Sequence, residues 1–167
     1  ERNFPPIMKL IEKLFEGTIL VPMRAKRKEE AIKELLTHLL SRDILSATVK
    51  LFENINEQEK DSTSSAGRGI AYPHSTSIEI DKLTCVLGVS PEGINFNSPD
   101  GHDCHLILLT LSPSDSPIEH RKFITRFRSM IDDPIIRSSL NESVSSKEII
   151  NIITQWEEDY NGKDDLL

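Results

Sequence analysis

The sequence of 167 residues lacks the features that mark membrane and secreted proteins. Its longest uninterrupted apolar run is 106–109, far short of the roughly 20 residues that a membrane helix needs. No charged and then apolar leader opens the chain, and Glu1 in place of Met suggests a processed chain or a piece of a longer protein. Two cysteines, Cys85 and Cys104, cannot form a disulfide framework. We therefore expect a cytoplasmic protein without direct membrane insertion.

Positive charge is also scarce. Lys and Arg number 20 against 27 Asp and Glu, which gives a net charge of −7. This balance excludes the basic surface expected of a nucleic-acid binder, so we expect no nucleic-acid partner. Apolar residues make up 37% and charged residues 28%, which is typical of a folded globular protein. The length fits one domain over 1–167.

Common nucleotide, hydrolase and metal motifs are missing. The segment 67–69 reads Gly-Arg-Gly, without the third glycine of a dinucleotide fingerprint or the lysine of a P-loop. Ser64, His74 and an acid could form a hydrolase triad, but no Gly-x-Ser-x-Gly elbow is present. His102 and His105 straddle a turn and a strand start, where residues three apart face opposite sides. We expect no cofactor and no metal.

Apolar periodicity and turn residues predict the secondary structure. A helix is expected over 28–40, a second from Ser46 through about 52, and a loop over the polar stretch 54–65. The run 105–111 is apolar on both faces, which is typical of a central strand covered on each side. The predicted strands are 69–72, 83–90 and 104–111, with turns at 91–93 and 99–101.

Helix-start signals dominate the last third of the chain. Capping boxes occupy 116–119 and 145–148, and Asp133 precedes a proline that opens a short helix. The acidic end, 157–167, is expected to fray. Helices before and after the strands predict an α/β domain, with a mixed β-sheet and helices packed on both faces.

His74 is the first candidate for chemistry. Two glycines precede a short apolar run that Pro73 ends, because proline cannot donate to a sheet ladder. His74 is therefore expected at a strand end, where reactive groups sit on a rigid base. The hydroxyls of Ser64 and Ser65 and nearby backbone N–H groups could hold phosphate oxygens. The simpler interpretation is a polar loop residue.

His120 is the second candidate. It shares one helix face with Phe123, Ile124, Phe127 and Ile131, so it is expected to point inward at the first turn of its helix. The positive end of a helix lowers the pKa of a histidine and stabilises a nearby anion. Both effects suit a neutral imidazole beside phosphate. The alternative is a partly buried histidine bonded to a carbonyl.

An ordered set of motifs extends beyond these histidines. The set is Lys28-Glu29-Glu30-Ala31-Ile32, the Ser-Thr loop before Gly67, Gly-x-Gly-Ile-Ala-x-Pro-His ending at His74, Gly93-Ile94-Asn95-Phe96, Asp100-Gly101, the strand 104–111 and His120. In this order and spacing, the chain over about 20–153 closely resembles the IIA domain of the fructose and mannitol class of the sugar phosphotransferase system, including its nitrogen-regulatory branch.

The resemblance implies that His74 accepts a phosphoryl group from the phosphocarrier protein HPr or a paralogue. It also implies that His120 assists by hydrogen bonding without being phosphorylated. The chain departs from the family at Gln58, which stands where the family has an arginine, while Glu59 keeps the following glutamate. Glutamine brings no charge, and a neutral hydrogen bond is roughly half as strong as a charge-assisted one. Lys60 or Arg68 is therefore a hypothetical substitute cation.

Three functions remain open from the sequence. The first is a phosphoryl carrier or phosphorylation-state sensor, nitrogen-regulatory-like or sugar-specific. The second is a regulatory binding module attached to an ion or solute transporter, with weak or no phosphorylation, which Gln58 favours. The third is a serine hydrolase using Ser64.

Overall fold

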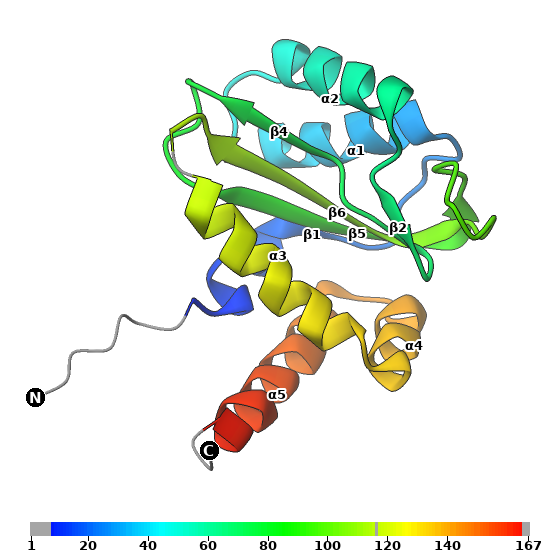
Figure 1. Cartoon of the computed structure of the whole chain (residues 1–167), viewed down its shortest axis with the longest axis vertical. Helices are drawn as coiled ribbons and strands as arrows, with labels where there is room; N and C mark the ends of the chain where they lie inside the picture. Colours follow the sequence, from blue (N-terminus) through cyan, green and yellow to red (C-terminus); the bar gives the residue numbers. More distant parts are fainter. Residues whose placement is uncertain (1–7, 116, 165–167) are drawn as a thin grey trace, which may run out of the picture.

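The structure is a computed structural model that describes residues 8–115 and 117–164, with side chains to 160. A six-stranded mixed sheet forms the middle layer (Figure 1). The strands are β1 (Ile19–Leu20), β2 (Ser65–Gly67), β3 (Ile70–Ala71), β4 (His74–Ser77), β5 (Thr84–Ile94) and β6 (Cys104–Pro113). The helices are α1 (Lys28–Ser41), α2 (Val49–Asp61), α3 (Pro117–Ile131), α4 (Pro134–Glu142) and α5 (Ser146–Asp164), with 3₁₀ turns η1 (Leu10–Glu12) and η2 (Glu16–Thr18).

The order of paired strands is β1-β5-β6-β3-β2, and β4 also pairs with β6. β5 and β6 form the antiparallel centre, while β3 and β4 run parallel to β6 along the same edge. β3 pairs with Leu106 and Ile107, and β4 pairs with 110–113. β3 and β4 therefore lie end to end along β6, and the pairing is interrupted between them at Tyr72 and Pro73.

Alternate residues of the central strands enter two separate cores. Leu106 and Leu108 of β6 belong to the core covered by α3, α5 and η1, while Ile107 and Leu109 belong to the core covered by α1 and α2. Figure 1 shows α1 and α2 on one side of the sheet and α3 to α5 on the other. The prediction of an α/β domain with helices on both faces is confirmed, as is the central position of 105–111.

Several predicted boundaries were wrong. The expected loop 54–65 is helical as far as Asp61, because Leu51, Ile55 and Glu59 recur every four residues and all three are buried. Ser46 is not the cap of this helix, since Thr48 holds that position. The expected turn at 91–93 lies within β5, where the pairing with β6 becomes irregular.

The C-terminal helix also runs further than expected. α5 continues to Asp164, and the Glu157 side chain is buried where fraying was expected to begin. Half of the capping box before α5 is present: Glu148 N–H donates to Ser145 Oγ at 3.2 Å, whereas the Glu148 carboxylate accepts from Val144 N–H, one residue before the expected Ser145 N–H. For the box before α3, Ser116 lies outside the described residues. Among 8–115 and 117–164, no helix is both long and apolar enough to cross a membrane.

Candidate functional site

His74 is placed by the interruption between β3 and β4. Pro73 has no N–H for the ladder, but its carbonyl accepts a hydrogen bond from Thr110 N–H at 3.1 Å, which fixes the backbone beside β6. His74 follows as the first residue of β4, with its Cα paired to Thr110, and its side chain is exposed. The imidazole therefore stands on a rigid strand end and faces solvent, as the sequence predicts.

The hydrogen bond of His74 fixes its tautomer. Nδ1 lies 3.1 Å from the carbonyl oxygen of Tyr72. A carbonyl oxygen can only accept, so Nδ1 carries a proton, and in the neutral ring Nε2 therefore carries the lone pair. Nε2 has no hydrogen-bond partner among the described residues. The ring is thus held by one nitrogen and offers the other as a nucleophile.

His120 lies beside this ring. The two imidazole centroids are 5.9 Å apart, and the ring planes are tilted by 35°. His120 is in the first turn of α3, half-buried, with Nε2 2.9 Å from Thr110 Oγ1. Burial and, to a smaller extent, His74 lower the pKa of His120 below its ordinary value. A neutral ring is therefore favoured next to His74.

The predicted phosphate-binding hydroxyls divide into two kinds. Ser64 Oγ is buried and has no hydrogen-bond partner within 8–115 and 117–164, while Ser64 N–H donates to the buried Glu59 carboxylate at 3.1 Å. Ser65 Oγ donates to the Ile70 carbonyl and lies 2.6 Å from Ser98 Oγ. Ser65 is thus bonded within the fold, whereas Ser64 retains an unused donor. Because Ser64 Oγ is not bonded to His74, the pair lacks the nucleophile–base contact of a serine hydrolase.

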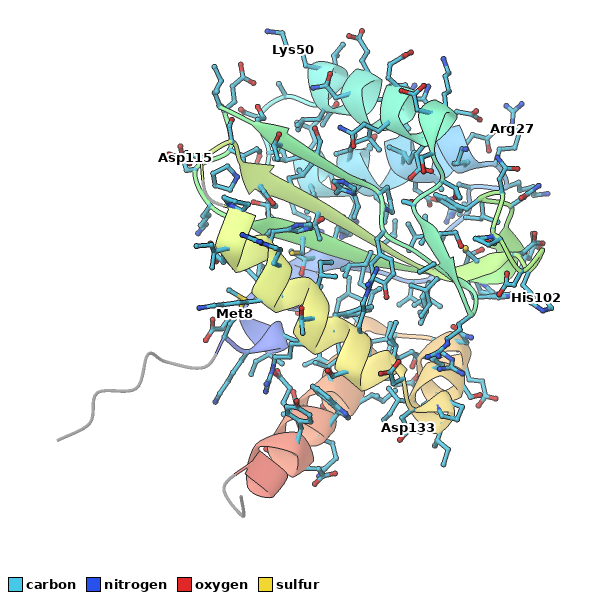
Figure 2. The ribbon with its side chains drawn as sticks, viewed as in Figure 1. Met8, Arg27, Lys50, His102, Asp115 and Asp133 are labelled. Atoms are coloured by element: carbon cyan, nitrogen blue, oxygen red, sulfur yellow. The ribbon has the colours of Figure 1, made fainter. Side chains whose placement is uncertain are left out.

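The candidate cations are bonded elsewhere. Arg68 Nη1 lies 2.8 Å from Asp132 Oδ1, just beyond the C-terminal end of α3, whereas His120 is at the N-terminal end. Figure 2 shows this separation, with Asp115 before the start of α3 and Asp133 after its end. Lys60 Nζ lies 3.4 Å from Glu57, and Gln58 is exposed on the last turn of α2. The structure does not bring Arg68 to the histidine pair.

The remaining histidine pair lies at the other end of the sheet. His102 is exposed and far from Asp115 in Figure 2. His105 Nδ1 donates to the Ser90 carbonyl at 2.8 Å. Across residues 8–115 and 117–164, no group of three His, Cys, Asp or Glu side chains is arranged to hold a metal ion.

Residues 12–156 match the sequence model of the family described as "Phosphoenolpyruvate-dependent sugar phosphotransferase system, EIIA 2". The chain belongs to this EIIA family. The family is a phosphocarrier family, so its chemistry agrees with a histidine whose Nε2 is free and solvent-facing.

Relatives of this EIIA domain include sugar-specific and nitrogen-regulatory proteins. Over 148 residues the chain is 30% identical to the fructose-specific EIIABC component of Bacillus subtilis (strain 168), covering 89% of this chain but 23% of that relative. The chain thus spans about a quarter of that protein's length.

Two solved structures share the fold. The nitrogen regulatory protein IIA-Ntr from Neisseria meningitidis superposes with a TM-score of 0.77 at 25% identity, covering 85% of this chain and 97% of that one. The mannitol IIA enzyme of Escherichia coli, solved in complex with phosphorylated enzyme IIB, superposes with a TM-score of 0.72 at 22% identity, covering 86% and 98%.

Sequence reasoning missed two residues that contact the candidate histidines. Tyr72 contributes its backbone carbonyl, which no sequence pattern reveals. Thr110 contributes a side chain, and it did leave a signal, since it is the one hydroxyl residue within an otherwise apolar stretch of a central strand. A buried polar residue at such a position normally has a hydrogen-bond partner.

Proposed function

We propose that this EIIA domain accepts a phosphoryl group on Nε2 of His74 from the phosphocarrier HPr or a paralogue. The observation that carries the proposal is the hydrogen bond from His74 Nδ1 to the Tyr72 carbonyl, which leaves Nε2 unprotonated on an exposed ring. The proposal also puts the domain in the cytoplasm, with the donor protein.

The transfer balances without a net proton loss. The Nε2 lone pair of His74 attacks phosphorus in line, the new P–N bond forms, and the P–N bond to the donor's histidine breaks with its electron pair returning to the donor ring. The His74 ring gains positive charge, which the Tyr72 carbonyl stabilises through the retained Nδ1–H bond. No metal or nucleotide takes part in this step.

The surroundings proposed for the phosphoryl oxygens are mostly neutral donors. Ser64 Oγ is an unused hydroxyl, and the N-terminus of the 15-residue α3 carries partial positive charge. Gln58 is proposed as a neutral donor in the place of the family's arginine. Ser65 is proposed to act by holding the loop, and Arg68 would first have to leave Asp132. His120, being neutral, can hydrogen-bond to phosphate without becoming its acceptor.

The test is phosphorylation by a reconstituted donor chain. Incubation with phosphoenolpyruvate, enzyme I and HPr is expected to add about 80 Da to the wild type. The species is expected to disappear in His74→Ala and to persist in the control His102→Ala, which alters an exposed histidine at the other end of the sheet. Phosphorylation that survives His74→Ala would refute the assignment.

A second candidate is a regulatory module on an ion or solute transporter, with weak or no phosphorylation. Two observations favour it: Gln58 brings no charge, and the Arg68 side chain is held by Asp132. The same assay separates the two candidates. Absence of the added mass with several HPr homologues would favour the module, and Gln58→Arg would then be expected to restore phosphorylation if the missing charge is the cause.

A further inference from the structure

Thr110 is a polar residue on an apolar face. Along β6, Leu106 and Leu108 point into the core under α3, and Thr110 continues that alternation with none of its surface exposed. Valine has nearly the same shape and would fill this position without burying a hydroxyl. Burying a hydroxyl costs free energy unless it is hydrogen-bonded, so the bond that Thr110 makes is the feature to explain.

Thr110 is linked to the surroundings of both histidines. Its backbone N–H donates to the Pro73 carbonyl, and its Cα is paired with the Cα of His74 in the register of β4 and β6. Its hydroxyl lies 2.9 Å from Nε2 of His120 and has no other hydrogen-bond partner among the described residues. One residue of the central strand therefore fixes the backbone before His74 and the ring of His120.

The direction of the hydrogen bond follows from counting donors. If the Thr110 hydroxyl donates to Nε2, every donor in the contact is satisfied, and His120 carries its proton on Nδ1. If Nε2–H donates instead, the hydroxyl hydrogen of a fully buried residue has no acceptor in the described structure. An unsatisfied buried donor is unfavourable, so the first arrangement is preferred.

The remaining ring nitrogen is available to a ligand. Among the described residues, Nδ1 of His120 has no hydrogen-bond partner, and it is not one of their buried unpartnered atoms, which are His38 Nε2, Ser64 Oγ and Asn141 Oδ1. It therefore reaches solvent at the site where the rings are 5.9 Å apart.

We infer that Thr110 is a positioning residue that holds His120 in the Nδ1–H tautomer, so that His120 presents an N–H, and not a lone pair, to a phosphoryl group on His74. The opposite tautomer would aim a lone pair at the phosphate oxygens and repel them. The inference rests on the proposed function for its purpose, while the tautomer itself is a property of the unphosphorylated protein.

The first experiment reads the tautomer directly. Two-bond ¹H–¹⁵N spectra of the histidine rings, recorded at neutral pH without any donor, are expected to show a protonated Nδ1 on His120 in the wild type and in Thr110→Ser. Thr110→Val is expected to shift the proton toward Nε2, and Thr110→Ala serves if the valine variant does not fold. Thr84→Val is the matched control, since its hydroxyl bonds only to the nearby Lys82 carbonyl.

The second experiment measures the rate of phosphorylation by HPr. Thr110→Val is expected to slow it roughly two- to tenfold, the effect of one hydrogen bond, with the serine variant and the Thr84 control near the wild-type rate. A wild-type His120 protonated on Nε2, or a tautomer unchanged by Thr110→Val and Thr110→Ala, overturns the inference. Failure of wild-type phosphorylation would instead refute the proposed function and leave the spectroscopic result standing.

Discussion

Replacing Glu157 with glutamine should destabilise the domain, because it weakens the hydrogen bonds that hold the N-terminal turn η1 to helices α3 and α5. The Glu157 carboxylate is buried in α5, where Oε2 accepts from Leu10 N–H at 2.9 Å and from Arg126 Nε at 2.7 Å. Oε1 accepts from Ile11 N–H at 3.1 Å. One side chain therefore joins η1, α3 and α5.

The expected loss in the free energy of unfolding follows from the number of hydrogen bonds that a glutamine side chain can accept at this position. If the glutamine oxygen takes the Oε2 position, the bonds from Leu10 and Arg126 are kept, but the NH₂ group faces the N–H of Ile11. If the amide is flipped, the bond from Ile11 is kept and the bonds from Leu10 and Arg126 are lost. One unsatisfied buried N–H costs about 1–3 kcal/mol, and losing the charge opposite the Arg126 side chain, itself only 10% exposed, adds on the order of 1 kcal/mol. We expect a loss of about 3 kcal/mol, or roughly 6–12 °C in Tm for a chain of this size.

Urea denaturation at pH 7, followed by circular dichroism, measures the change. Glu158→Gln is the matched control, because Glu158 is the exposed neighbour in the same helix and should leave stability within about 0.5 kcal/mol of wild type. Amide exchange at Leu10 and Ile11 should accelerate in Glu157→Gln by more than the global loss explains. A Glu157→Gln variant as stable as the Glu158 control would refute the reasoning.

Other predictions concern the cores. Burial lowers the pKa of His38, with Arg42 adding to the effect, so the unfolded chain binds this proton at higher pH than the folded chain. Stability should therefore fall as pH drops below about 6.5, and His38→Gln should show a shallower fall in Tm between pH 7.5 and 5. Burial raises the pKa of the Cys85 thiol, so it should not react with a thiol reagent such as dithionitrobenzoate until the protein unfolds; reaction in the native state would contradict this. Gly88→Ala should cost about 1–3 kcal/mol in urea unfolding, because a Cβ there would overlap the Met23 sulfur and lie 2.8 Å from the Leu35 side chain in the core.

Periodicity predicted the long elements of the fold and missed the short ones. The helix from Lys28 and the apolar strand β6 carry enough repeats for their pattern to be recognised. β1 has two residues and β4 reads His-Ser-Thr-Ser, so their pairing is decided by the neighbouring strands and not by their own sequence. The polar composition of α2 concealed a four-residue spacing that was present in the sequence.

The candidate site was predictable where side chains form it. His74 and His120 were both expected from their local motifs, and the structure brings them together. The environment of Arg68 was not predictable, because its partner Asp132 lies 64 residues away in the sequence. The tautomer of His74 depends on a backbone carbonyl, which every residue possesses, so no residue type signals it.

The spacing of the two imidazoles is a property of the sheet and not of the surrounding loops. The backbone before His74 and the ring of His120 are both bonded to Thr110 of β6, so this one position of the sheet links the placement of the two imidazoles. Exposed positions in the joining segments 78–83 and 95–103, such as Ile78 and Glu79, make none of these bonds, whereas Ile80, Leu83 and Phe96 are buried in the cores. Substitutions at such exposed positions therefore leave the spacing of the two imidazoles unchanged, so the surface around the pair can vary separately from the pair itself.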